Sequence, residues 1–339
     1  MAEFEEAFSG KIESISLLRM IGAAGIALYH IGTFNSYIET PQAGVSLFFC
    51  ISGFLMMYTT QKGGTKNFLV NRLIRIVPLY WLMTGATFVA MWLMPSVFSG
   101  GASITELIDS LFFIPYARGG LKTAIVVRPI VGPGWTLFYD LWFTVVFALC
   151  MRISERLKGL LVVVVCTAML PFQWKFPMER PFLYMISMPW WLSFATGVLA
   201  FYLLRWLWNK KVPGYIRFIL GILGLIALYL MFCLRLDMIR NAFLSLVVLT
   251  CTVVLFRKAK MPHTINLLGD VSFSFYLIHY YVIMVFGKIF DWKVISLKTC
   301  TGIVLVFLCS IWLAYISYRL VEQMMGNWLK KKTSLMQLI

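Results

Sequence analysis

Charged residues are scarce in this sequence. Asp, Glu, Lys and Arg together make up 13% of its 339 residues, whereas about 25% is usual in soluble domains. Hydrophobic residues reach 60% and the mean hydropathy is +0.83, which is more apolar surface than a water-soluble globule of this length can bury. The composition excludes a soluble domain, a disordered chain and a disulfide-stapled secreted domain, and it predicts an integral membrane protein with several spans.

The sequence also lacks the usual signatures of metal and nucleotide chemistry. It has only 14 acidic residues, and none of the Walker, GxGxxG, HExxH or GxSxG patterns occurs. The seven cysteines include no CxxC pair, so they predict neither a zinc site nor a disulfide framework. We therefore expect no metal site, no resident cofactor and no magnesium-dependent sugar transfer.

Long apolar runs cover most of the chain. A helix needs about 20 mostly apolar residues to cross a bilayer, and these runs predict an all-α polytopic transmembrane bundle of about ten spans. The expected spans lie near residues 15–37, 43–60, 76–98, 134–153, 159–173, 183–206, 218–234, 241–256, 271–289 and 299–320. The apolar stretch 105–116 is too short to cross, so we expect it to be interfacial or re-entrant.

The net charge of +16 is explained by topology. Lys and Arg collect in the cytoplasmic loops of polytopic proteins, and about two thirds of the 30 basic residues fall on one side of the ten-span arrangement. This bias predicts that both termini are cytoplasmic, and it gives no reason to expect nucleic acid as a partner. The chain begins without a signal-peptide pattern and shows no internal repeat, so we expect one membrane domain over residues 1–339.

Arg19 and His30 are ionisable residues in the first predicted span. Such groups are costly inside a membrane, which makes each of them a candidate functional residue. Eleven residues turn a helix by about 1100°, close to three full turns, so both side chains lie on one face. The pair predicts a polar stripe with His30 near mid-membrane or beyond; the alternatives are a snorkelling arginine and a histidine that only bonds neighbouring helices.

Three further patterns place polar groups in or beside spans. Arg72 and Arg75 lie one helical turn apart, with Lys66 upstream, and can form a fork for phosphate or carboxylate oxygens unless they only mark a cytoplasmic loop. Asp140 follows Trp135 in an apolar helix, where it either orients an imidazole or forms a structural ion pair with an arginine. His279 lies within the ninth predicted span, with Tyr276 on the same face one turn earlier, whereas His263 lies in a basic loop.

Taken in order, these patterns resemble the acyltransferase-3 family of bacterial multi-span O-acyltransferases. The matching elements are L-R-x10-H at 18–30, the G-V-x-L-F-F segment at 44–55, R-x-x-R with P-L-Y-W at 72–81, W-x-L-x-x-D at 135–140, S-x-Y-L-x-H at 274–279 and Y-R-x-x-E at 318–322. Two positions depart from the pattern, because Ser46 stands where the family usually has Asp and Asp140 where it usually has Glu. The likeness covers a core from 14 to 322, with no fused SGNH domain expected.

The resemblance implies that an acetyl group passes from cytoplasmic acetyl-CoA to a hydroxyl of an exopolysaccharide, a lipopolysaccharide O-antigen or a lipid-linked precursor. The resemblance also implies that the protein lies in the bacterial inner membrane, with membrane lipid as a partner. It implies the following roles: catalysis by His30 with Asp140, donor binding by Arg19, Arg72, Arg75 and Lys66, and acceptor binding or support by Trp135, Tyr139, Tyr276, His279 and Ser52. Alternatives are another acyl group, a non-glycan acceptor, a flippase of lipid-linked sugars, or a scaffold without chemistry.

Overall fold

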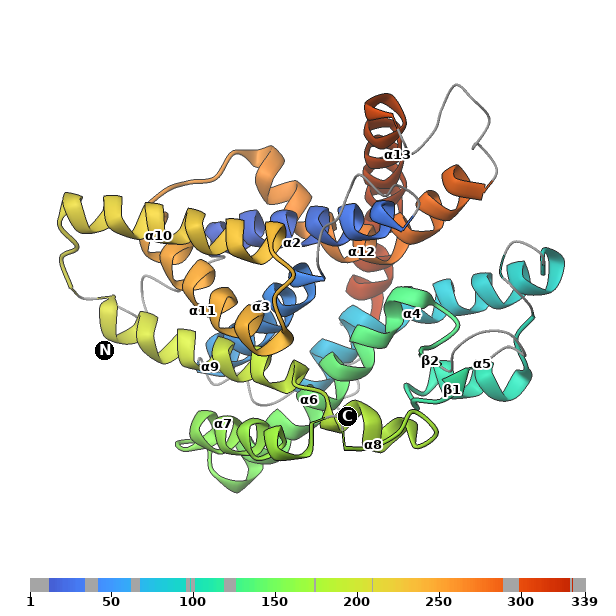
Figure 1. Cartoon of the computed structure of the whole chain (residues 1–339), viewed down its shortest axis with the longest axis horizontal. Coiled ribbons are helices and arrows are strands. Elements are labelled where there is room, and N and C mark those ends of the chain that lie inside the picture. Colours follow the sequence, from blue (N-terminus) through green and yellow to red (C-terminus); the bar gives the residue numbers. More distant parts are fainter. Residues whose placement is uncertain are drawn as a thin grey trace. The chain divides into compact units, whose positions relative to one another are not determined.

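The computed structural model describes residues 12–33, 42–61, 68–95, 98, 101–118, 126–173, 175–208, 210–288, 299–329 and 331. These residues are mainly helical (Figure 1). A small exception is an antiparallel pair of two-residue strands, β1 (Ala117–Arg118) and β2 (Val126–Val127). The predicted all-α class is confirmed.

Within the described part of the chain, nine helices are long and apolar enough to cross a membrane. They are α2 (Glu13–Gly32), α3 (Ala43–Thr60), α4 (Phe68–Leu93), α6 (Trp135–Ile153, preceded by the 3-10 turn η1, Gly132–Gly134), α9 (Trp190–Leu207), α10 (Gly214–Cys233), α11 (Met238–Leu255), α12 (His263–Lys288) and α13 (Cys300–Ser317, continued by the π-helix η3, Tyr318–Met325). This arrangement confirms a polytopic helical membrane protein.

The stretch expected to span at 159–173 is a shorter helix. It consists of α7 (Lys158–Ala168) followed by the 3-10 turn η2 (Leu170–Phe172), and α7 rises only about 16 Å, roughly half of the hydrocarbon thickness. Pro171 lies in the turn that ends the α-helical hydrogen bonding. The cytoplasmic placement of both termini, which the bias of basic residues predicts and which requires an even number of spans, stays a prediction.

The chain divides into two compact units, and the first comprises residues 1–66, 149–169 and 189–272. Helix α3 packs against α2, α9, α10 and α11 in this unit. A Cβ atom at Gly53 would overlap the carbonyl oxygen of Phe194 in α9, and one at Gly197 would overlap the carbonyl oxygen of Cys50 in α3. Glycine on both sides thus lets the two backbones touch, as at close helix crossings in membranes.

Helix α2 is held in the same way within this unit. A Cβ atom at Gly44 of α3 would lie 2.5 Å from the carbonyl oxygen of Gly22 in α2. At the other side of α2, Ser16 packs directly on Gly269 in the first part of α12. The Glu13 carboxylate also accepts a hydrogen bond from the backbone N–H of Met261. Close backbone contacts therefore fix the helix that carries Arg19 and His30.

The second unit comprises residues 67–148, 170–188 and 273–339. It includes α5 (Ile104–Leu111), whose first turn is closed by a capping box between Ser103 and Glu106, and α8 (Pro181–Ser187). Trp81 of α4 donates a 2.8 Å hydrogen bond to the carbonyl of Leu111 and so ties α5 to α4. The stretch expected to be interfacial is thus a short helix that exposes apolar side chains at Ile104 and Ile108.

Candidate active site

His30 and Arg19 lie on one unbroken helix, as expected. Because α2 runs from Glu13 to Gly32 without interruption, the eleven-residue spacing places both side chains on one face, about 16 Å apart along the axis. The helix ends earlier than the predicted 15–37, so His30 lies in its last turn and not near its middle. Thr33 closes this end, since its N–H and its Oγ1 donate to the His30 carbonyl at 3.2 and 2.7 Å.

The His30 side chain is half-buried and packs edge-on against Tyr29, with 5.2 Å between ring centroids. Arg19 is also half-buried. Ser52 is 9% exposed. It immediately precedes Gly53, the residue at which α3 crosses α9. Helix α2 therefore presents the imidazole of His30 and the guanidinium of Arg19, each partly buried.

Arg72 and Asp140 form an ion pair in the second unit. The Arg72 Nη2 atom donates to both carboxylate oxygens of Asp140, at 3.0 and 3.2 Å, and the two side chains are 15% and 16% exposed. Thr144 donates to the backbone carbonyl of Asp140 at 2.6 Å. Of the two interpretations of Asp140, the structure contains the ion pair with an arginine. Its expected effect on the imidazole of His30 stays a prediction.

The other predicted donor-binding residues differ in their surroundings. Arg75 lies one turn after Arg72 on α4 and is exposed. Its side chain is therefore not covered by the described part of the protein. Lys66, the third member of this predicted group, lies outside the described residues. Donor binding by all of these residues stays a prediction.

Tyr276 fastens the start of α6. Its hydroxyl donates to the carbonyl of Pro133 at 2.8 Å and lies 2.7 Å from Oγ1 of Thr136. One turn later, the fully buried His279 has Nδ1 3.0 Å from the carbonyl of Phe275. Because a carbonyl oxygen only accepts, this contact favours the tautomer with the proton on Nδ1.

Trp135 and Tyr139 continue this cluster along α6. Their rings pack edge to face, with 5.9 Å between centroids, and Tyr139 is 3% exposed. The buried ring of Tyr139 immediately precedes Asp140, so its packing helps to set the direction of the helix face that carries the carboxylate. Acceptor binding by this aromatic pair stays a prediction.

The motifs at 72–81, 135–140, 274–279 and 318–322 are joined to one another in the second unit. Arg72 bonds Asp140, Thr136 lies within hydrogen-bonding distance of Tyr276, and Ser274 donates to the Glu322 carboxylate. These contacts connect α4, α6, α12 and η3 side to side. A hydrogen-bonded seam of polar side chains thus holds together helices that are otherwise apolar.

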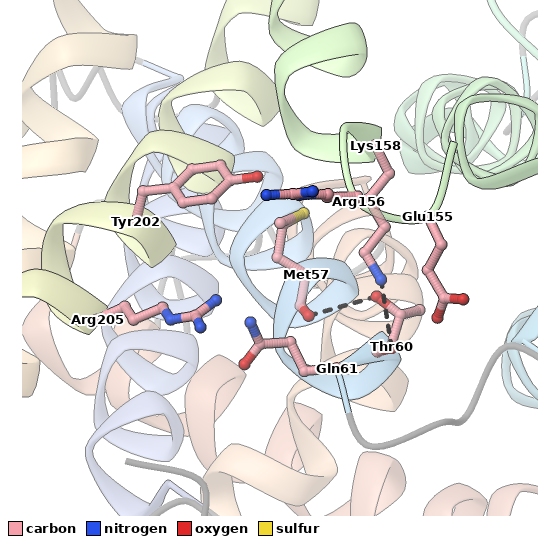
Figure 2. Close-up of a pocket in the computed structure, with 8 residues that line it drawn as sticks. All are labelled: Met57, Thr60, Gln61, Glu155, Arg156, Lys158, Tyr202 and Arg205. Atoms are coloured by element: carbon pink, nitrogen blue, oxygen red, sulfur yellow. Dashed lines mark hydrogen bonds between the residues drawn. The ribbon is translucent and has the colours of Figure 1, made fainter. Parts of the chain in front are cut away.

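Among the described residues, no group of three or more His, Cys, Asp or Glu side chains could hold a metal ion. Sequence reasoning missed a cavity in the first unit, where basic residues from the ends of separate helices converge (Figure 2). The available signal was the positive charge of Arg156, Lys158 and Arg205, which counted only toward the bias of basic residues to one side of the membrane. Their convergence depends on how α3, α7 and α9 pack.

The sequence matches the family described as "Acyltransferase domain" over residues 12–319. It is 30% identical over 264 residues to "Exopolysaccharide production protein ExoZ" of Rhizobium meliloti (strain 1021), covering 73% of this chain and 78% of that protein. It is 24% identical to "Nodulation protein 10" of Rhizobium leguminosarum bv. viciae, covering 62% and 64% of the two chains. It is also 24% identical to "Putative acetyltransferase ORF330" of Acidianus two-tailed virus, covering 78% and 81%. No solved structure matches the chain.

Proposed function

The chain belongs to the acyltransferase family that it matches over residues 12–319, and on this premise we propose that it is a membrane O-acetyltransferase. In this proposal, acetyl-CoA in the cytoplasm is the donor, and the acceptor is a hydroxyl of a surface polysaccharide or of its lipid-linked precursor. The observation that carries the proposal is His30 on the same helix face as Arg19 in an acyltransferase with membrane-spanning helices. The similarity to a protein named for exopolysaccharide production supports a glycan acceptor.

The transfer needs a base that accepts the proton of the sugar hydroxyl and a source of a proton for the CoA thiolate that leaves. In one route, His30 takes the proton of the sugar hydroxyl while the oxygen attacks the thioester carbon; the C–S bond breaks and the CoA thiolate takes the proton from the imidazolium. In the other route, an imidazole nitrogen of His30 attacks the thioester carbon, the C–S bond breaks and CoA leaves as the thiolate. The sugar hydroxyl oxygen then attacks the acetyl carbon, the C–N bond breaks, and the hydroxyl proton passes to the thiolate. Both routes use one imidazole nitrogen and need no metal.

The ion pair between Arg72 and Asp140 supports the donor end of this proposal. By joining α4 to α6, it fixes the helix from which the exposed Arg75 projects. A guanidinium on a fixed helix suits the phosphates of CoA, because bidentate hydrogen bonds demand a defined orientation. We place the protein in the bacterial inner membrane as one functional domain, with both termini in the cytoplasm.

The proposal is tested with purified protein, acetyl-CoA labelled in the acetyl group, and membranes that carry the acceptor. Label that enters the polysaccharide and is released by mild alkali identifies an O-ester. The His30→Ala variant should transfer at least about 100-fold more slowly, since general-base assistance contributes about 10²–10⁴-fold. His263→Ala is the matched control, because His263 is exposed at the start of α12.

Three outcomes would contradict the proposal. Near wild-type transfer by His30→Ala would remove the imidazole from the mechanism. Label that enters lipid or peptide, and no glycan, would reassign the acceptor. Transfer only from longer acyl-CoA thioesters would reassign the donor while leaving the family chemistry intact.

A further inference from the structure

A cavity of about 250 Å³ lies in the first unit, at the ends of α3, α7 and α9 (Figure 2). Its lining residues are Met57, Thr60, Gln61, Glu155, Arg156, Lys158, Tyr202 and Arg205. They come from the last turn of α3 and the residue that caps it, the turn before α7, the first residue of α7 and the last turns of α9. None of them is among the residues assigned to acetyl transfer.

Basic residues outnumber acidic residues among the described residues that line the cavity. Arg156, Lys158 and Arg205 contribute three cations and Glu155 contributes one carboxylate. In Figure 2 the carboxylate of Glu155 lies on the far side of Thr60 from Arg205. Two neutral donors also line the cavity: in Figure 2 the amide of Gln61 lies between Arg205 and Lys158, and the hydroxyl of Tyr202 lies beside Arg156.

Lys158 forms the inner wall of this cavity. It is only 5% exposed, and its Nζ donates a 3.3 Å hydrogen bond to the carbonyl of Thr60, the last residue of α3. Burial lowers the pKa of Lys158, although the charge of Glu155 acts in the opposite direction. An ammonium group has three protons to donate, so an anion in the cavity would both accept a hydrogen bond and offset the cost of burial.

The size and donor set of the cavity suit a phosphate ester. A volume of about 250 Å³ equals about eight water molecules at roughly 30 Å³ each, which accommodates a phosphate and part of the molecule that carries it. Guanidinium groups bind phosphate oxygens through paired hydrogen bonds. Arg156 and Arg205 both line the cavity and can supply such donors, and in Figure 2 the hydroxyl of Tyr202 lies next to Arg156.

We propose that this cavity binds the phosphate group of a phosphorylated ligand. Two sources carry this chemistry to a membrane protein, namely a soluble nucleotide and the headgroup of an anionic phospholipid. The proposal does not depend on the proposed acetyl transfer, because binding to the cavity is measured without turnover.

The first arm of the test uses protein purified in a phosphate-free detergent and measures binding of adenosine 3′,5′-bisphosphate by calorimetry. The second arm measures retention of phosphatidylglycerol against diacylglycerol, which lacks the phosphate, by native mass spectrometry. Arg156→Gln and the double variant Arg156→Gln/Arg205→Gln should weaken binding of the phosphate-bearing probe at least tenfold. Arg217→Gln is the matched control, since Arg217 is an exposed arginine of α10 outside the cavity.

Three comparisons decide the result. Loss of nucleotide binding in the variants supports the site with a soluble ligand, and loss of phospholipid retention supports it with a lipid. Measuring the binding of adenosine 3′,5′-bisphosphate to Arg75→Gln separates binding at the cavity from binding at the proposed donor site. The proposal is overturned if neither probe binds the wild type, or if Arg156→Gln, which changes an exposed turn residue and should fold normally, binds both as tightly as the control.

The His30→Ala variant distinguishes binding at the cavity from acetyl transfer. This variant should lose acetyl transfer and keep wild-type binding at the cavity, because His30 does not line it. Conversely, cavity variants that lose the probe and still transfer acetyl groups would leave the proposed function intact.

Discussion

Removing one partner of the Arg72–Asp140 pair should destabilise the second unit strongly. Loss of one partner of a buried pair lowers the free energy of unfolding by about 3–5 kcal/mol. Because the two side chains are 15% and 16% exposed, we expect a value at the lower end of that range. Arg72→Met or Asp140→Leu alone should therefore lower the free energy of unfolding by about 3 kcal/mol. The double variant removes both charges of this pair. Its cost should therefore fall at least about 2 kcal/mol below the sum of the single costs.

The measurement is a double-mutant cycle on purified protein in mixed micelles, unfolded with increasing SDS and followed by tryptophan fluorescence. Asp140→Glu should unfold at an SDS fraction close to that of the wild type, because the longer carboxylate still reaches Arg72. Arg240→Met is the control, since the Arg240–Asp237 pair is 70% and 54% exposed and such pairs contribute about 0.2–1 kcal/mol. Single costs that add within about 0.5 kcal/mol in the double variant would refute the reasoning, because independent sites behave in that way.

Three further variants test other contacts. Tyr276→Phe should cost about 1–2 kcal/mol, since it removes the hydroxyl that bonds Pro133 and Thr136; an unchanged midpoint of thermal unfolding would contradict this. Gly197→Ala should lower the midpoint of thermal unfolding, because the new methyl group overlaps the carbonyl of Cys50. Gly221→Ala should leave the midpoint unchanged, because its methyl group meets no atom within 4 Å. Equal effects of the two variants would argue against the close crossing of α3 and α9. Arg75→Gln should raise the KM for acetyl-CoA with little change in kcat, and added salt should raise the wild-type KM more than that of the variant; a KM equal to that of the wild type at low salt would exclude Arg75 from donor binding.

Most of the helices were predictable because a membrane span depends on local composition. The run at 43–60 was predicted with the bounds that α3 has, and the predicted spans at 218–234 and 241–256 correspond to α10 and α11 within a few residues. The errors arose where a helix end depends on something other than hydropathy. Helix α12 begins at His263, eight residues before the expected start, because its first turns are polar and still helical.

The sequence by itself determined that this is a helical membrane protein, and it identified which rare polar residues need an explanation. It left two interpretations of Asp140 open, because Arg72 lies 68 residues away on another helix and periodicity describes only one helix at a time. The packing of α4 against α6 forms the ion pair of one interpretation, while the orientation of an imidazole by Asp140 stays a prediction. In the same way, only the approach of α3, α7 and α9 brings Arg156, Lys158 and Arg205 around one cavity. The hydropathy that predicts a membrane span is a property of one continuous segment, so it can be inferred from local sequence. Hydrogen bonds and ion pairs between helices depend on two distant segments and on how they pack.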